Sequence, residues 1–367
     1  MPKEVTLKPK LTPWFVAYII FSIPGFIVSL LTMALVSVLL LGTLAAIGSA
    51  DEEVTANQVV YESYPGYAKY TASELVQPSK VLVYEMNGTI LSGGDDASAS
   101  DLRSNIYLSK VLKDFQEIKQ DTSVKAVVFK MNTPGGEVAA AEQIGDAINS
   151  LMKAKNQKQT VFYWDEIVAS GGVYITVKSN NNYIVANQYG QSGSIGVIIR
   201  LLDLQGLYDK IGVKYRVYKS SESKDYGAED RNPTVDENKF IQSQVDDAYN
   251  RFIDLVSTGR KIDRSEVVKF ANGFVYDNDR SKDLKLLDKL GSIDDAVAQA
   301  ANNNGLKEGD YVVVKMQAKK DAWEELFGPE AKSNLVQKVL GVDLGSVTTA
   351  DKLKSSQIYL LDPAYIN

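Results

Sequence analysis

Residues 124–136 read Val-Lys-Ala-Val-Val-Phe-Lys-Met-Asn-Thr-Pro-Gly-Gly, and this stretch sets the fold class. Its mostly apolar beginning is typical of a strand buried in a parallel sheet, and its Pro-Gly-Gly turn leads into a helix predicted over 138–154. The same order occurs before it, where a strand at 80–86 precedes a helix at 101–120, and after it, where a strand at 160–164 precedes another helix. Strand, turn and helix in this repeated order predict an α/β fold.

Beyond the third strand the same signals continue to alternate. They predict strands at 183–186, 213–218 and 311–316, and helices at 235–255 and 263–271. The predicted strand at 213–218 would also decide which way the lysines in and next to it point, because alternate residues of a strand share a face.

The composition excludes several kinds of catalytic site. The 367-residue chain contains neither histidine nor cysteine, so Ser-His-Asp triads, Cys-His dyads, zinc sites with these ligands and thiol redox chemistry are ruled out. Asp203, Asp209 and Asp225 have no metal-ligand spacing, and we expect neither a metal nor a cofactor. A net charge of -6, with lysines scattered among acidic residues, argues against nucleic-acid binding.

The N-terminal part contains a predicted membrane anchor. Residues 14–47 include no charged side chain, and because Pro24-Gly25 divides this run, the predicted transmembrane helix is 26–47. Lysines precede the run and acidic residues follow it, which leaves the N-terminus in the cytoplasm and the rest of the chain outside the cell membrane. The alternative is a cleaved signal peptide ending at 48–50, although the apolar run is longer than that of an ordinary signal sequence.

The predicted organisation has four parts. Residues 1–50 are the cytoplasmic N-terminus and the single-pass anchor, and 51–78 are a polar stalk. Residues 79–303 form the main folded domain, and 304–367 form a C-terminal extension. Its apolar tail at 358–361 is expected to dock on a subunit, because an exposed apolar run usually packs against something.

Two glycine-containing turns are candidate parts of a site. Gly135 and Gly136 can expose backbone N–H groups, because glycine permits positive φ and has no side chain to block a substrate carbonyl. Ser170 is predicted at the start of a helix, where the positive end of the helix dipole favours developing negative charge and the Gly171 amide is free to donate. Taken singly, the first turn is more often a plain turn, and a serine in this position is more often a helix N-cap.

Four motifs occur in order along the chain, and together they are far more specific than any one of them. They are Val-Val-Phe-Lys-Met-Asn-Thr-Pro-Gly-Gly at 127–136, Val-Ala-Ser-Gly-Gly-Val-Tyr-Ile at 168–175, Ser-Gly-Ser-Ile-Gly-Val at 192–197, and the lysine-containing stretch at 218–225. This combination resembles the signal peptide peptidase A family of membrane-anchored serine proteases, and the resemblance covers about residues 80–300.

The resemblance implies a Ser/Lys-dyad protease with a Clp protease/crotonase-like fold of repeated ββα units. In that family's pattern Ser170 matches the nucleophile and Lys224 the general base. Gly136 and the Gly171 amide match the oxyanion hole, and Ser194 matches a serine that orients the lysine. The loop around Lys224 departs from the pattern, since its first Lys-Ser is followed by serine where the family usually has glycine.

The identity of the base stays open from the residues themselves. A lysine with an ordinary pKa near about 10.4 is protonated at neutral pH, so the base must be desolvated or near another cation. Lys219 competes with Lys224, whereas Lys178 would lie about 12 Å along the helix from the serine. Asp165 and Glu166 are disfavoured, because exposed strand-end carboxylates usually cap turns.

The sequence therefore predicts a membrane-anchored serine endopeptidase whose catalytic domain is extracytoplasmic. The family resemblance implies signal peptide remnants and membrane-proximal polypeptides as substrates. It also implies a homo-oligomeric ring in which serine and lysine can come from neighbouring subunits. One alternative is a catalytically inactive scaffold or binding module of the same fold, and another is a crotonase-like acyl-CoA enzyme.

Overall fold

The computed structural model describes residues 60–69, 78–94, 97, 99–157 and 159–316. No helix within these ranges has the length and apolar character needed to cross a bilayer. The anchor at 1–50 lies outside the described residues, as do most of the stalk and most of the C-terminal extension. The anchor and the docking tail therefore stay predictions of the sequence, whereas residues 61–63 of the predicted stalk form a strand that pairs with the sheet.

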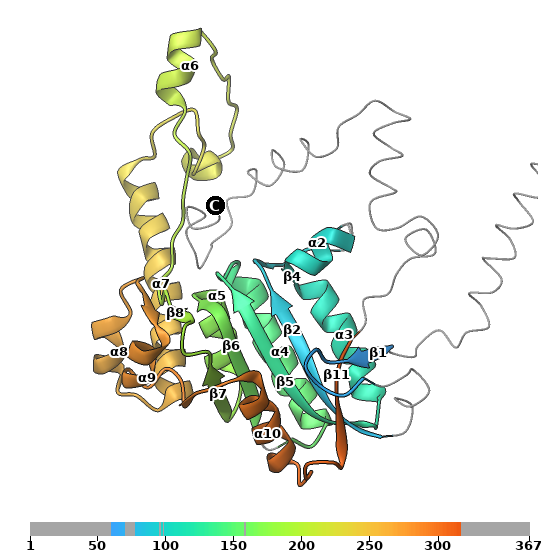
Figure 1. Cartoon of the computed structure of the whole chain (residues 1–367). Helices are drawn as coiled ribbons and strands as arrows, with labels where there is room; N and C mark the ends of the chain where they lie inside the picture. Colours follow the sequence, from blue (N-terminus) through green and yellow to red (C-terminus); the bar gives the residue numbers. More distant parts are fainter. Residues whose placement is uncertain (1–59, 70–77, 95–96, 98, 158, 317–367) are drawn as a thin grey trace, which may run out of the picture. The chain divides into compact units, whose positions relative to one another are not determined.

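A nine-stranded sheet forms the centre of the described chain. Its main strands, in order across the sheet, are β1 (Tyr61–Ser63), β11 (Tyr311–Met316), β2 (Ser79–Asn87), β5 (Val124–Thr133), β6 (Thr160–Ala169), β7 (Asn182–Ala186) and β10 (Lys289–Leu290). Two further strands extend it, because β8 (Gln191–Gly193) pairs with the end of β6 and β9 (Val275–Asp277) pairs with β8. All pairings are parallel except β1 with β11 and β8 with β9, which confirms the α/β class (Figure 1).

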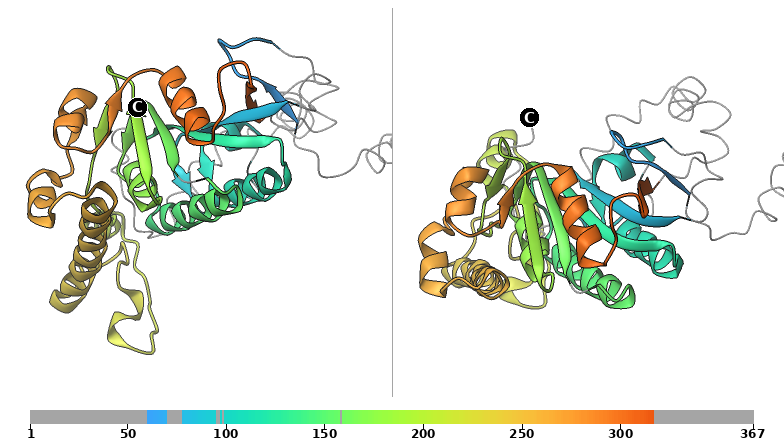
Figure 2. Two further views of the ribbon diagram at one scale, coloured as in Figure 1. Left: turned by 90° about the horizontal axis from the view of Figure 1, so that it is seen from below. Right: turned by 60° about the horizontal axis from the view of Figure 1, so that its bottom comes forward.

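Helices pack on both faces of this sheet (Figures 1 and 2). One face is covered by α3 (Leu108–Gln120), α4 (Val138–Ala154), α5 (Gly171–Lys178) and α7 (Val235–Arg260), and the other by α10 (Ile293–Asn303). Successive residues of a strand point to opposite faces. Phe129 and Trp164 accordingly join the larger core under α3, α4, α5 and α7, whereas Val128 and Val161 pack with α10. The predicted helix at 138–154 is confirmed.

The predicted helix at 101–120 is wrong at its start, where the chain is interrupted. The observed elements are α2 (Ala99–Ser104), β4 (Ile106–Tyr107) and then α3. β4 pairs in parallel with β3 (Ile90–Leu91), and the Ile106 N–H donates to the Thr89 carbonyl at 2.9 Å. Ile106 is buried, so the short pairing forms because it covers apolar side chains beneath this loop.

The remaining elements follow β8 in the chain. They are α6 (Gln205–Ile211), the 3-10 turn η1 (Glu222–Asp225), α8 (Arg264–Phe270) and α9 (Asn278–Asp283). Residues 199–234, which we call the arm, carry α6 and η1 away from the sheet beyond the start of α7 (Figure 1). Every residue of the arm is described, and none of them is buried.

The predicted strand at 213–218 is wrong. Residues 213–219 have no regular secondary structure, and no strand among the described residues pairs with them. A β-strand needs a neighbouring strand for its backbone hydrogen bonds, and the arm offers none. The alternating apolar residues there are instead exposed, together with other apolar residues of the arm: Leu202, Leu207, Ile211, Val213, Tyr215, Val217, Tyr218 and Tyr226.

Candidate active site

Ser170 lies at the junction where β6 ends and α5 begins, with φ 52° and ψ -111°. A positive φ is strained for a residue other than glycine. Hydrogen bonds hold this backbone, since the Ser170 N–H donates to the Gly193 carbonyl at 2.7 Å and its carbonyl accepts from the Tyr174 N–H at 2.9 Å. The side chain is fully buried, and its Oγ has no hydrogen-bond partner among the described residues. A strained backbone and an unpartnered buried hydroxyl together mark a candidate functional residue.

The turn at Gly135 and Gly136 packs directly against this serine. A Cβ added to Gly135 would lie 2.9 Å from Ser170 Cβ, and one added to Gly136 would lie 2.1 Å from the Ile90 carbonyl oxygen. The φ values of the two glycines are 106° and 152°, and the Gly135 carbonyl accepts from the Ile90 N–H at 2.8 Å. Only glycine fits at both positions, because a side chain would collide with backbone and the conformation would be strained.

Two backbone amides lie beside Ser170. A Cβ added to Gly171 would lie 3.2 Å from the Gly136 nitrogen, so the two glycine backbones are in close contact. Neither the Gly136 nor the Gly171 N–H has an acceptor among the described residues. Gly171 is also the first residue of α5, where the helix dipole favours negative charge. Two free N–H donors next to a serine hydroxyl are the groups that can stabilise an oxyanion.

The loop at the end of β8 forms another wall of the site. Ser194 is half-buried, has φ 51°, and donates its N–H to the Phe274 carbonyl at 2.7 Å. Its neighbour Gly193 provides the carbonyl that holds the Ser170 N–H. The structure therefore brings Ser170, Gly136, Gly171 and the Ser194 loop together from turns that follow three different strands.

Lys224 and Lys219 are not hydrogen-bonded to Ser170 in the single chain, because Ser170 Oγ has no partner among the described residues. Lys224 is exposed in η1, on the arm. Lys219 also lies on the arm, and its Nζ is 2.7 Å from Asp225 Oδ1. In the single chain the serine is therefore buried where β6 ends, whereas both amines lie on the exposed arm.

The other groups weighed from the sequence are engaged elsewhere. Lys178 pairs with Glu142 and with Asp146, and although burial lowers its pKa, these hydrogen bonds outweigh burial and raise the pKa above its ordinary value. Asp165 pairs with Lys130 at 3.2 Å. A protonated, paired lysine and a paired carboxylate are both poor proton acceptors for a serine.

Comparison with known proteins places the chain in a family. Residues 152–307 match peptidase family S49. A protein of Enterococcus faecium that carries the name of a signal peptide peptidase, SppA, is 31% identical over 71% of this chain and 73% of its own length. A protein of Synechocystis sp. that carries the name of a protease is 32% identical over 75% of this chain and 87% of its own.

The chain belongs to peptidase family S49. The S49 match contains Ser170, Ser194 and Lys224 and begins after Gly136. Protease 4 of Haemophilus influenzae is a further relative, 27% identical over 70% of this chain and 40% of its own length. The family and the protease names of its relatives make the chain a serine-type peptidase. Among solved structures, ClpP1 from Listeria monocytogenes has a TM-score of 0.34 and 13% identity, covering 57% of this chain and 91% of its own.

A cavity of about 750 Å³ lies close to the turn at Gly135 and Gly136. Its walls come from α4, α5 and α7 and from Ser92 and Glu137, and Glu137 directly follows Gly136 in the chain. Apolar side chains make up much of its lining, including Val138, Tyr174 and Leu255. A mostly apolar cavity of this size can hold a side chain of a bound peptide.

The sequence did not identify the polar network beneath the Ser194 loop. Ser192 Oγ bonds to Asn278 and to Ser281, each at 2.8 Å, and Asn278 Nδ2 donates to the Asn187 carbonyl at 2.7 Å. Ser192, Asn278 and Ser281 are fully buried, so the network fixes β8 to α9. Residues so far apart in the chain give no local signal. Within the described residues no cluster of acidic side chains could hold a metal ion.

Proposed function

We propose that this S49 peptidase is a serine endopeptidase with a Ser/Lys dyad, in which Ser170 is the nucleophile and Lys224 the general base. The observation that carries the proposal is the buried, unpartnered Oγ of Ser170, held at positive φ beside the free amides of Gly136 and Gly171. A hydroxyl without a partner is available to an amine that arrives from elsewhere.

The reaction starts when neutral Lys224 takes the Ser170 proton as Oγ attacks the carbonyl carbon of a peptide bond. The Gly136 and Gly171 amides donate to the oxyanion of the tetrahedral intermediate. Protonated Lys224 then gives its proton to the leaving amine, and an acyl-enzyme ester remains on Ser170. Water hydrolyses this ester in the same way, with Lys224 again removing and returning a proton. Ser194, beside the nucleophile, orients the lysine.

The site becomes complete when a second copy of the chain supplies Lys224. In one chain the lysine is exposed on the arm, and the arm also carries exposed apolar side chains that a neighbouring subunit would cover. In such a contact the lysine would lose water, and loss of water disfavours a charged amine over the neutral one that a general base requires. We therefore infer a homo-oligomeric ring with the dyad formed across each interface.

The substrates are peptides close to the membrane, namely signal peptide remnants and fragments of membrane proteins. The uncharged run at 26–47 would anchor the chain in the cell membrane, with the catalytic domain on the extracytoplasmic side. The name of the Enterococcus faecium relative, signal peptide peptidase, agrees with this class of substrate.

Covalent labelling and a chemical rescue test the dyad. A fluorophosphonate probe is expected to modify Ser170, with no labelling of Ser170→Ala. Lys224→Cys is expected to lower casein hydrolysis by about 10²- to 10⁴-fold, the usual contribution of a general base. Treatment with 2-bromoethylamine converts this cysteine into a lysine analogue and should restore activity. The natural chain has no cysteine, so the reagent acts at one thiol.

Lys219→Cys is the matched control, since the two lysines share the arm and the charge. We expect it to keep most of its activity with or without the reagent. An inactive Lys219→Cys that 2-bromoethylamine restores, beside an active Lys224→Cys, would make Lys219 the base. If Ser170 is not labelled in the assembled wild-type protein, the chain is an inactive scaffold.

A further inference from the structure

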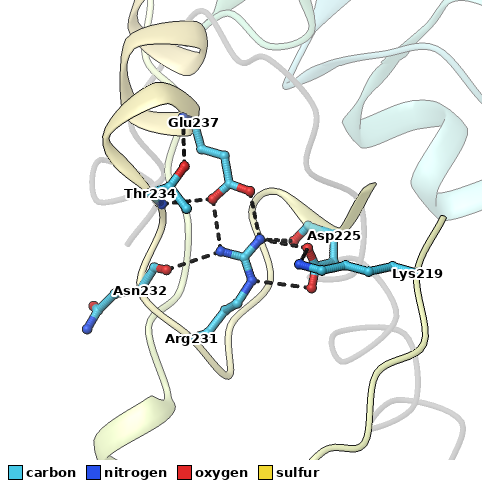
Figure 3. Close-up of polar contacts among 6 residues, drawn as sticks. All are labelled: Lys219, Asp225, Arg231, Asn232, Thr234 and Glu237. Carbon is cyan, nitrogen blue, oxygen red and sulfur yellow. Dashed lines mark hydrogen bonds and ion pairs between the residues drawn. The ribbon is translucent and has the colours of Figure 1, made fainter. Parts of the chain in front are cut away.

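An ion-pair cluster joins the arm to α7 immediately beside Lys224. We call it the arm cluster, and it consists of Lys219, Asp225, Arg231 and Glu237 (Figure 3). The side chains of Asp225 and Arg231 are 19% and 26% exposed, whereas that of Glu237 is 1% exposed. Scattered surface ion pairs contribute little to stability, but a network with bidentate geometry and a buried member is an exception.

The Arg231 guanidinium is at the centre of the cluster, between the two carboxylates. Its Nη2 is 2.7 Å from an oxygen of Asp225 and 2.7 Å from an oxygen of Glu237, while Nε reaches the second Asp225 oxygen at 3.2 Å and Nη1 the second Glu237 oxygen at 2.9 Å. Nη2 also donates to the Asp225 carbonyl at 3.3 Å. This forked, doubly bidentate geometry is specific to arginine, because a lysine ammonium cannot face two carboxylates in this way.

Lys224 depends on this cluster for its position. It immediately precedes Asp225, whose carboxylate and carbonyl Arg231 both hold. η1 has no buried residue, and the arm residues on either side of it are exposed or half-buried. Lys224 itself has no ion-pair partner within the part of the chain that the structure describes. Among the described residues, the apolar contact nearest the lysine is that of the exposed Tyr226 ring with the exposed Phe240 ring of α7, 5.6 Å between centroids. The clamp on Asp225 is therefore the strongest restraint next to the lysine.

The other end of the clamp is rigid. Glu237 lies in the first turn of α7, where it forms a capping box with Thr234. One face of the far half of the same helix is buried, and its Phe252 ring packs with its centroid 5.1 Å from that of Tyr174 on α5, the helix that follows Ser170. A continuous path of packed or hydrogen-bonded residues thus connects the nucleophile's helix to the turn that carries Lys224.

The capping box makes Arg231 unnecessary for starting α7. The Thr234 N–H donates to Glu237 at 2.9 Å and the Glu237 N–H donates to Thr234 Oγ1 at 3.2 Å, which satisfies the helix start without help. What Arg231 adds is a bridge, because its guanidinium bonds to Glu237 on α7 and to Asp225 at the same time. This guanidinium also neutralises the Asp225 carboxylate, which would otherwise be free to pair with the adjacent Lys224 and keep it protonated.

We propose that Arg231 is a positioning residue for the Ser/Lys reaction, because it clamps Asp225 to the start of α7 and so holds Lys224 where it meets the serine. This inference rests on the proposed function. It applies equally whether the serine belongs to the same chain or to a neighbouring copy.

Arg231→Lys tests the clamp while keeping the positive charge. Fluorophosphonate labelling of the full-length, assembled protein gives a maximal labelling rate and a half-saturation concentration. We expect the maximal rate to fall about tenfold or more, because small displacements of a catalytic group have effects of this size. The half-saturation concentration should stay within about twofold of wild type, because Arg231 does not contact the probe.

Arg260→Lys is the matched control. Arg260 makes an equivalent bidentate pair with Asp288, at 2.8 and 3.1 Å, at the opposite end of α7 from the arm cluster. We expect it to leave both labelling parameters within about twofold of wild type. If Arg231→Lys changes the maximal rate no more than Arg260→Lys does, the inference is wrong. It is equally wrong if the loss of labelling tracks loss of assembly in size-exclusion chromatography.

A double-mutant cycle with Asp225→Asn identifies the partner through which Arg231 acts. If the clamp on Asp225 is what matters, Arg231→Lys and Asp225→Asn should have similar effects, and the double variant should be no worse than either one. Additive effects would mean that Arg231 acts through Glu237 alone, which contradicts the inference.

The rescue of Lys224→Cys by 2-bromoethylamine distinguishes a failure of the dyad from a failure of the positioning role. If rescue fails, the dyad is wrong. If rescue succeeds while Arg231→Lys and Arg260→Lys have the same maximal labelling rate, only the positioning role of Arg231 is wrong.

Discussion

At the scale of single residues, the site depends on backbone conformations that few side chains allow. Ser170 has positive φ although it carries a side chain, and Gly136 lies so close to Ile90 that no Cβ fits. Strain of this kind persists only where the surrounding structure enforces it. At Ser170 the enforcing contact is the hydrogen bond to Gly193, which lies on a different strand.

Gly136→Ala tests this close approach. A new Cβ would lie 2.1 Å from the Ile90 carbonyl oxygen, so the turn must shift and its amide must move. We expect labelling of Ser170 to slow about 10²-fold, the effect of losing one oxyanion donor, and urea unfolding to show a loss of about 1–3 kcal/mol. Gly206→Ala is the control, since nothing lies within 4 Å of its added Cβ. A Gly136→Ala protein that is labelled at the wild-type rate would contradict the oxyanion role.

At the scale of elements, α7 has two roles along its length. Its C-terminal half is buried against α5 through Ala248, Phe252 and Val256, whereas its N-terminal half extends to the arm and ends in the arm cluster. Apolar packing therefore stabilises the C-terminal half, and ion pairs stabilise the N-terminal end. The two halves should therefore respond differently to pH.

Acid is expected to loosen the arm before the core unfolds. Hydrogen bonds from Arg231 lower the pKa of Glu237 to about 2 and also lower that of Asp225. Carboxyls with depressed pKa values stabilise the folded arm above their ordinary pKa near about 4, and this stabilisation is lost as the pH falls toward 2. Hydrogen exchange of 219–237, corrected for intrinsic rates, should accelerate over this window. Glu237→Gln should show a weaker dependence on pH, and an unchanged dependence would contradict the assignment.

At the scale of the whole molecule, the two proposed catalytic groups lie on different parts of one chain. Ser170 is buried at the end of the sheet, whereas Lys224 is exposed on an arm whose apolar side chains are not covered by the described residues. A second copy that accepted the arm would cover those side chains and bring an amine to the serine. Repeating one such contact around an axis gives a ring when the rotation between neighbouring copies closes.

Co-expression of two inactive variants tests the shared site. Ser170→Ala and Lys224→Ala chains are each expected to be inactive alone. In mixed assemblies about one site in four would combine an intact serine with an intact lysine, so about a quarter of wild-type activity should return. If each dyad formed within one chain, every site would lack one group. Mixed assemblies without activity would therefore place the dyad in a single chain.

Sequence alone was sufficient for the α/β class, for most of the strands and helices, and for the candidate nucleophile. Buried strands and amphipathic helices have local patterns that one chain reveals, and α4 is observed over the range its pattern predicts. The absence of histidine and cysteine from the sequence likewise excluded every catalytic site that needs an imidazole or a thiol.

Only the tertiary structure decided how distant residues meet. The segment at 213–218 has the alternation of a strand but forms none, because a strand requires a partner strand and none of the described strands lies beside the arm. The fit of Gly136 against Ile90, the network of Ser192 with Asn278, and the Arg231 clamp all join residues from separate elements. Such contacts depend on how the elements pack in space, and periodicity along the chain carries no record of that packing.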